Sequence, residues 1–284
     1  MKSCLVVERL EQYAATLAAE HKVADRVQRV NLLLPRLEEN SRKLIAAYKE
    51  LAESIRQEHV ISPAAEWLVD NFHIVEDQVR EIREDLPRGY YRELPKLAEG
   101  DFKDYPRIYA LSIALVAHTD SHLDTETLRG FINAYQKVSP LSIGELWAVP
   151  ISLRLALVEN LRRLTTRIVS SRGEREEADK LADKLLELIR RQPDEVVPLL
   201  SSRYGKRKMM SHTFAVQLTQ RLREQDPGLL VVFEWLEKQL AKEQVSIDQV
   251  VRDEHRRQAA SAGHGGQHHH QHAPAFDAGL ERLL

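Results

Sequence analysis

Histidines are the residues whose spacing in this sequence most readily suggests chemistry. Five of them fall within nine residues near the end of the chain, in GHGGQHHHQH: His264, His268, His269, His270 and His272. Imidazole clusters bind Ni, Cu and Zn, so the last four are candidate metal ligands. His118 and His122 form a second pair, four residues apart, and two imidazoles at this spacing can chelate zinc from one helical turn. The glutamate of a zinc-protease motif is missing there, so we interpret this pair as helix-end residues.

Carboxylates at helical spacing offer a second kind of chemistry. In EDQVREIRED (76–85), Glu76 and Asp77 could serve as acid and base, and together with His118 and His122 they could form an enzyme site. The acidic residues alternate with arginines at i,i+3 and i,i+4 spacing, which is typical of a solvated helix face. We find no glycine-rich phosphate loop, no G-x-S-x-G and no D-x-D signature. We therefore assign no catalytic residue, no cofactor-binding residue and no cofactor.

Composition narrows the class of protein. The 41 basic and 43 acidic residues are well mixed and give a net charge of -2, which argues against a nucleic-acid partner. The basic stretch RYGKRKMM (203–210) is too short to change this. The single cysteine, Cys4, cannot form an internal disulfide and suits a reducing compartment. The longest nearly apolar run, 108–117, is about half of what a bilayer-spanning helix needs. We expect a soluble, cytoplasmic chain with no direct membrane span.

Apolar residues recur at three- and four-residue spacing nearly throughout, which predicts an all-α fold, a multi-helix array or bundle with a disordered C-terminal tail. Four N-termini are predicted by capping residues: Ser62 before Pro63, Asp124, Ser142 with Glu145, and Ser246 with Gln249. The helix from Ser62 is expected to run without interruption through Ile82 and to be stopped by Pro87 and Gly89. The segment around residues 90–106 is predicted to be an ordered loop, and Pro106 to open a helix ending near His118.

The sequence also suggests where helices end. The helix from Ser142 is expected to reach about Ser170, with a kink at Leu146–Trp147 caused by Pro150. Beyond Gly173 we expect more charged helices at 174–191, 208–223, 228–243 and 246–260. The predicted domains are N-terminal amphipathic helices (1–60), a helical core (61–172), a second helical bundle (173–260) and the tail (261–284).

Several long stretches resemble the N-terminal region of cyclic β-1,2-glucan synthases. They are VERLEQYAATLAAEH (7–21), NFHIVEDQVREIREDLPRGYYRELPKL (71–97), YPRIYALSIALVAHTDSHLD (105–124), FINAYQKVSPLSIGELWAVPISLRLALVENLRRL (131–164) and QVVRDEHRRQAAS (249–261). The resemblance implies a much longer parent, a bacterial inner-membrane glycosyltransferase that uses UDP-glucose. This chain has no Q-x-x-R-W and no other catalytic motif of that family, so no family catalytic residue is carried onto it.

We therefore expect a structural or regulatory helical fragment that is inactive alone and whose partners are the parent's own membrane and glycosyltransferase regions. If the codons for HHHQH are translated in the neighbouring reading frame, they can encode IITSM. The translated stretch around it is similar to the segment that follows this region in members of the family. This predicts a frameshift near residue 262 that truncates the chain, and an exposed apolar surface that promotes self-association. The alternative is a free-standing helical binding protein with a His-rich metal-binding tail.

Overall fold

The computed structural model describes residues 2–24, 32–57, 61–86, 89–119, 123–204, 210–223, 225, 227–242, 244–253 and 256. Within these residues every regular element is a helix and no residue belongs to a β-strand, which confirms the predicted all-α class. None of these helices is both long and apolar enough to cross a bilayer. The predicted disordered tail, 261–284, lies outside the described residues.

The chain divides into two compact units, and the boundary falls between Thr166 and Arg167, inside one long helix. Described residues up to Thr166 form unit 1, and those from Arg167 onward form unit 2. The predicted segments 1–60 and 61–172 thus belong to the same unit, except for residues 167–172, which belong to unit 2.

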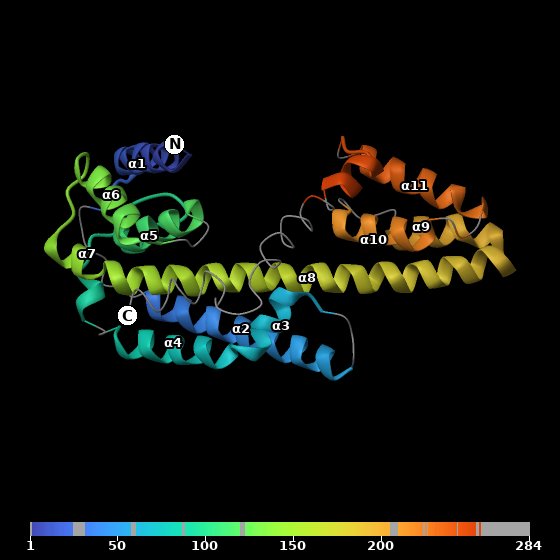
Figure 1. Cartoon of the computed structure of the whole chain (residues 1–284), viewed down its shortest axis with the longest axis horizontal. Helices are drawn as coiled ribbons and strands as arrows, with labels where there is room; N and C mark the ends of the chain where they lie inside the picture. Colours follow the sequence, from blue (N-terminus) through green and yellow to red (C-terminus); the bar gives the residue numbers. More distant parts are fainter. Residues whose placement is uncertain are drawn as a thin grey trace. The chain divides into compact units, whose positions relative to one another are not determined.

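Unit 1 is a layered array of helices. It contains α1 (Lys2–Glu20), α2 (Leu33–Arg56), α3 (Pro63–Asp70), α4 (Phe72–Glu84), α5 (Arg107–His118), α6 (Thr125–Gln136), α7 (Ile143–Trp147) and the first part of α8 (Val149–Arg191). In Figure 1 this part of α8 lies between two layers: α2, α3 and α4 on one side, α1, α5 and α6 on the other. Because both sides of α8 are covered, its residues from Ile151 to Leu161 are mostly apolar, and all except Arg154 and Asn160 are buried.

The loop before α5 is ordered, as predicted, by backbone pairing. Isolated β-bridges join Val23 to Leu97 and Lys96 to Pro106. The Ala24 N–H donates to the Lys96 carbonyl at 2.9 Å, and the Ala98 N–H donates to the Lys22 carbonyl at 2.8 Å. These bonds attach the chain leaving α1 to the segment that leads into α5.

The predicted helix starts are confirmed at all four capping residues. Ser62 accepts from the Ala65 N–H, Asp124 from the Thr127 N–H, and Ser246 from the Gln249 N–H. Ser142 and Glu145 form both halves of a capping box at the start of α7. Each of these contacts joins residues three apart, so local sequence is enough to specify them.

Two predicted helix runs were wrong. The helix opened by Ser62 is divided at Asn71, whose side chain donates to the Trp67 carbonyl at 2.9 Å and ends α3. The helix opened by Ser142 stops at Trp147, and α8 begins at Val149. Pro150 therefore lies in the first turn of a new helix, where its missing N–H costs nothing, and produces a break instead of the predicted kink.

Gly173 does not end a helix. The predicted boundary near 170–174 is wrong, because α8 runs without interruption through this glycine to Arg191, over 43 residues. An exposed glycine inside a helix costs only about 1 kcal/mol. Leu161 before it and the series Ala178, Leu181 and Leu185 after it are buried, so packing on both sides outweighs that cost.

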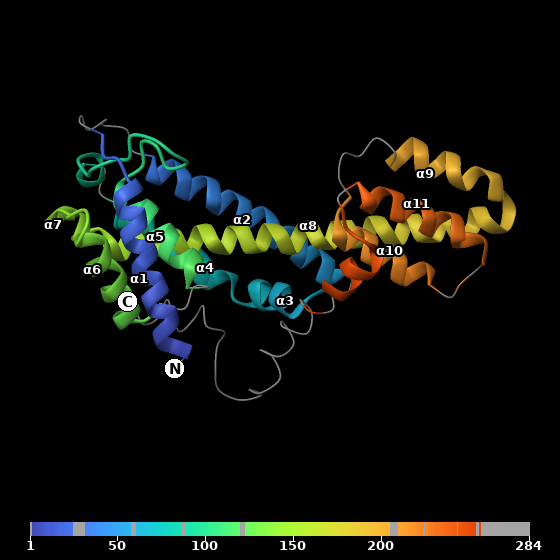
Figure 2. The same cartoon turned by 90° about the horizontal axis from the view of Figure 1, so that it is seen from above.

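Unit 2 packs shorter helices on the second part of α8. These are α9 (Val196–Tyr204), α10 (His212–Leu222) and α11 (Leu230–Ala241), with residues 247–253 also helical, as Figure 2 shows for the labelled elements. Helix α9 was not predicted from the sequence; it follows a 3₁₀ turn at Pro193–Glu195 and carries Pro198 in its first turn. The unit's core is apolar and includes Leu185, Leu200, Phe214, Val232 and Leu236.

Candidate functional site: two buried ion-pair networks

The described part of the chain contains no cluster of three or more His, Cys, Asp or Glu side chains that could hold a metal ion. His118 ends α5, where its Nδ1 lies 2.9 Å from the Ala114 carbonyl oxygen and its ring stacks on Tyr13 at 3.9 Å. It therefore has the helix-end role that we expected. His122, His268, His269, His270 and His272 lie outside the described residues, so their metal binding stays a prediction.

Two residues of the acidic and basic segment in α4, Asp77 and Arg83, form exposed ion pairs. Asp77 accepts from Arg80 at 2.6 Å, and both side chains are exposed. Arg83 pairs with a different helix: its guanidinium reaches Glu38 of α2 through two hydrogen bonds, 2.6 and 3.1 Å long. A two-point contact between helices is better than a single i,i+4 contact. In Figure 1, α4, which carries Glu76 and Asp77, lies on the opposite side of α8 from α5, which ends at His118, so the structure does not bring these three residues together.

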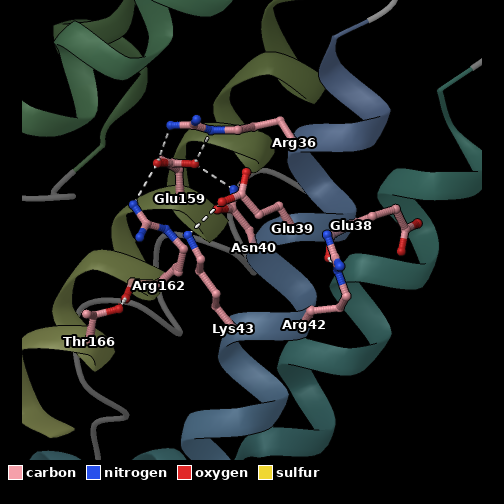
Figure 3. A network of polar contacts seen from close by, with 9 residues as sticks. All are labelled: Arg36, Glu38, Glu39, Asn40, Arg42, Lys43, Glu159, Arg162 and Thr166. Atoms are coloured by element: carbon pink, nitrogen blue, oxygen red, sulfur yellow. Dashed lines mark hydrogen bonds and ion pairs between the residues drawn. The ribbon is translucent and has the colours of Figure 1, made fainter.

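The first buried network surrounds Glu159 of α8. Its carboxylate accepts two hydrogen bonds from Arg36 at 2.8 and 2.9 Å, one from Asn40 at 2.6 Å and one from Arg162 at 2.9 Å. Figure 3 shows that Arg36 and Asn40 approach from α2, while Arg162 lies one turn further along α8. The network therefore joins two helices whose residues are more than a hundred positions apart in sequence.

Opposing effects act on the pKa of Glu159. Burial raises this pKa, while the hydrogen bonds from Arg36, Asn40 and Arg162 lower it and prevail, so the pKa lies below its usual value. At Arg36, the hydrogen bonds that it donates to Glu159 outweigh burial and raise its pKa. Both groups stay charged near neutral pH, and the Glu159 carboxylate is well supplied with donors. It is therefore poorly suited to proton transfer.

The second network joins α5 to α7. Arg107 donates from Nε and Nη2 to the two oxygens of Glu145, both at 2.8 Å, and the two side chains are 6% and 0% exposed. Its remaining donors reach Ser139 Oγ at 2.7 Å and the Pro140 carbonyl at 3.1 Å. Glu145 also accepts from the backbone N–H of Ser142 at 2.9 Å. One carboxylate thus caps α7 and neutralises a buried arginine.

Tyr135 and His21 extend this network toward α1. The Arg107 guanidinium carbon lies 5.8 Å from the centre of the Tyr135 ring, and the Tyr135 hydroxyl lies 2.9 Å from His21 Nδ1. Burial raises the pKa of Tyr135 to about 12. Burial and the nearby Arg107 charge lower the pKa of His21, so the imidazole is neutral near pH 7. His21 is the first residue after α1, and Val23, two residues later, forms the β-bridge with Leu97.

Only part of these networks was predicted from the sequence. Glu145 was predicted as a capping residue, but its partner Arg107 was not, and neither were Arg36, Asn40 and Glu159. One signal was available: Glu159 stands in LRLALVENL (153–161), where most neighbours are apolar. A carboxylate in such a run is buried only when a cation pairs with it.

The geometry of both networks serves helix positioning. Each carboxylate is surrounded by donors from its own chain, and the described residues around them include no group of three or more His, Cys, Asp or Glu side chains placed to hold a metal ion. Removing Arg107 would leave the Glu145 charge buried without a cation, which is strongly destabilising, whereas Glu159 without Arg36 would keep Arg162 as a partner at 2.9 Å. The networks fix α2 against α8 and α5 against α7.

Comparison with known proteins identifies a protein that is similar in sequence to this chain. No protein-family model matches it. Over 213 residues, 75% of this chain, the sequence is 36% identical to a protein named cyclic beta-(1,2)-glucan synthase NdvB from Rhizobium meliloti (strain 1021). The resemblance predicted from the sequence is thus confirmed, and the chain has a glycosyltransferase-related origin. The match covers 7% of the length of that relative.

Proposed function

We propose that this chain is a helical scaffold or regulatory region of a cyclic β-1,2-glucan synthase and has no transferase activity by itself. The observation that carries the proposal is the identity over 213 residues to a protein of that name, of which the match covers 7%. The buried networks support a scaffold role, because every carboxylate in them is engaged in joining helices. In this proposal the glucosyl donor, UDP-glucose, binds elsewhere in the longer enzyme.

The first test asks whether the chain works alone. Purified chain is incubated with UDP-glucose and an acceptor glucan, and β-1,2-linked product is measured by mass spectrometry. We expect no product above a heat-denatured control. Product formation by the isolated chain would refute the proposal.

The second test asks whether the chain can serve a synthase. A chimera replaces the matched segment of the Rhizobium relative with residues of this chain, and cyclic glucan is measured in cells lacking their own synthase. We expect glucan production in the chimera and a marked loss when Arg107→Ala is introduced, because the α5–α7 connection then carries an unpaired charge. Arg80→Ala, which removes an exposed pair, is the matched control and is expected to retain production.

The metal-binding alternative depends on His268, His269, His270 and His272. Deletion of 262–284 is expected to leave the unfolding curve unchanged if the scaffold proposal is correct. Loss of stoichiometric zinc binding together with loss of stability would favour the alternative. The proposed frameshift near residue 262 is tested by the nucleotide sequence, whose neighbouring frame should encode the synthase-like continuation.

A further inference from the structure

Unit 1 carries a group of exposed apolar residues in the connection between α6 and α8. It consists of the exposed residues Val138, Pro140, Ile143, Trp147 and Pro150, which we call the α7 patch. Trp147 is 76% exposed and Ile143 is 71% exposed. Scattered apolar residues are normal on protein surfaces, whereas a group containing a highly exposed tryptophan marks an interaction site.

The ion pair beneath α7 directs this patch outward. Glu145 is two residues from both Ile143 and Trp147, so it points to the opposite side of the helix, where Arg107 binds it. Ile143 and Trp147 are four residues apart and share the outer face. The capping box at Ser142 fixes the start of the same short helix. The patch is therefore presented by a rigid element.

Polar groups around the patch are already used within the protein. Ser139 Oγ and the Pro140 carbonyl accept from Arg107, and the N–H and hydroxyl of Ser142 bond to Glu145. A protein–protein interface carries about one hydrogen bond per 100–200 Å². This segment has few groups left to supply them. The apolar face of a bilayer interface requires none, so a lipid surface suits the patch better than a protein partner.

The charges in the segment that carries the α7 patch also favour a lipid surface over a protein partner. Within residues 137–150, KVSPLSIGELWAVP, the only acidic residue is Glu145, which is 0% exposed and paired with Arg107. The only other charged residue there, Lys137, is exposed. The segment can thus approach anionic headgroups without bringing an exposed carboxylate of its own, and tryptophan is enriched at the membrane–water interface.

We propose that the α7 patch docks on the surface of a lipid bilayer, with Trp147 and Ile143 entering the boundary between headgroups and acyl chains. This inference does not depend on the proposed scaffold function. Only two large side chains and a few small ones enter the lipid, so the patch binds weakly and reversibly, in the manner of a single acyl anchor. It orients unit 1 at a membrane without crossing it.

Vesicle binding by the full chain tests this proposal. Flotation is measured with vesicles of phosphatidylethanolamine and phosphatidylglycerol in equal parts. We expect measurable binding that the double substitution Ile143→Ser, Trp147→Ser lowers by about tenfold or more, since it removes most of the apolar area that enters the lipid. Leu230→Ser is the matched control: it removes an exposed apolar side chain, 65% exposed, from unit 2, and should leave binding unchanged. Far-UV circular dichroism checks that the variants fold.

Insertion depth provides an independent readout. In a Trp67→Phe, Trp235→Phe background, Trp147 is the only tryptophan, and lipids brominated near the headgroup end of the acyl chain should quench its fluorescence. Absence of vesicle binding, or binding that the double substitution leaves unchanged, would contradict the proposal. Sedimentation velocity tests whether the patch binds a second copy of the chain instead. Self-association in solution that the same double substitution abolishes would assign the patch to a second copy and overturn the lipid assignment.

Discussion

The two units are held together by different interactions. Unit 1 contains ion pairs that join helices distant in sequence and whose carboxylates are buried. Arg107 and Glu145 are both buried, while Arg36, which pairs with the buried Glu159, is one-third exposed. Unit 2 has an apolar core, and its arginine Arg221 pairs with Asp179 and Asp183 of α8 where all three side chains are exposed. Buried charges tolerate few alternative arrangements, whereas an apolar core tolerates many. We infer that unit 1 is the more precisely specified of the two.

The largest expected effect comes from breaking the buried pair of unit 1. Arg107→Ala leaves Glu145 buried without its cation and should lower the free energy of unfolding of unit 1 by about 3–5 kcal/mol. Urea unfolding is followed by the fluorescence of Trp67 in a variant without Trp147 and Trp235. A loss below 1 kcal/mol would remove the distinction between the units.

A core substitution in unit 2 measures how much its apolar core contributes to stability, for comparison with the buried ion pair of unit 1. Leu236 is fully buried, and Leu236→Ala should lower the free energy of unfolding by about 2–5 kcal/mol through lost burial and a residual cavity. A variant that retains only Trp235 reports this change. Leu236→Met, which conserves volume, is the matched control and should cost less than about 1.5 kcal/mol.

Acidification should affect unit 1 through His21. The folded protein lowers the pKa of His21, so the unfolded chain binds this proton more readily. The stability contributed by the neutral imidazole is complete above the unfolded pKa of about 6.5 and declines as the pH falls below it. Unfolding of unit 1, measured at pH 7.5 and pH 5.5, should show this decline, and His21→Gln should reduce it. An unchanged pH dependence in His21→Gln would assign the effect to other groups.

The smallest effect is expected at the surface of unit 2. Arg221→Ala removes both exposed contacts with α8 and should change the free energy of unfolding by about 1 kcal/mol or less. The fluorescence of Trp235 reports this change as well. Added salt should weaken the wild-type contribution further. A loss of stability as large as that of Arg107→Ala would show that burial does not explain the difference between the Arg107–Glu145 pair of unit 1 and the exposed Arg221 pairs of unit 2.

Much of the fold could be predicted because helix starts depend on near neighbours. Ser62, Asp124, Ser142 and Ser246 were identified as caps, since a side chain and an N–H three residues later are brought together by the helix itself. Gly173 shows the limit of such reasoning. Its local preference favours a helix end, and packing of α8 in both units overrides that preference.

The candidate site was harder to predict, for a related reason. Arg107 and Glu145 are 38 positions apart, and Arg36 and Glu159 are 123 apart. A single sequence contains no signal that pairs them, because each of these residues is also a common surface residue of a helix. Exposure of Ile143 and Trp147 is equally hidden, since an apolar pair at i,i+4 spacing is the usual signature of a buried face.

By itself, the sequence determined the all-α class, the capped helix starts and the relationship to a cyclic β-1,2-glucan synthase, because these depend on local residue order and on similarity along the chain. Tertiary structure alone decided that α8 continues through Gly173, that Glu145 points inward to Arg107 and that Trp147 faces outward. The physical reason is that burial is set by neighbours distant in sequence. Burial decides whether a charge needs a partner and whether an apolar side chain remains free to bind one.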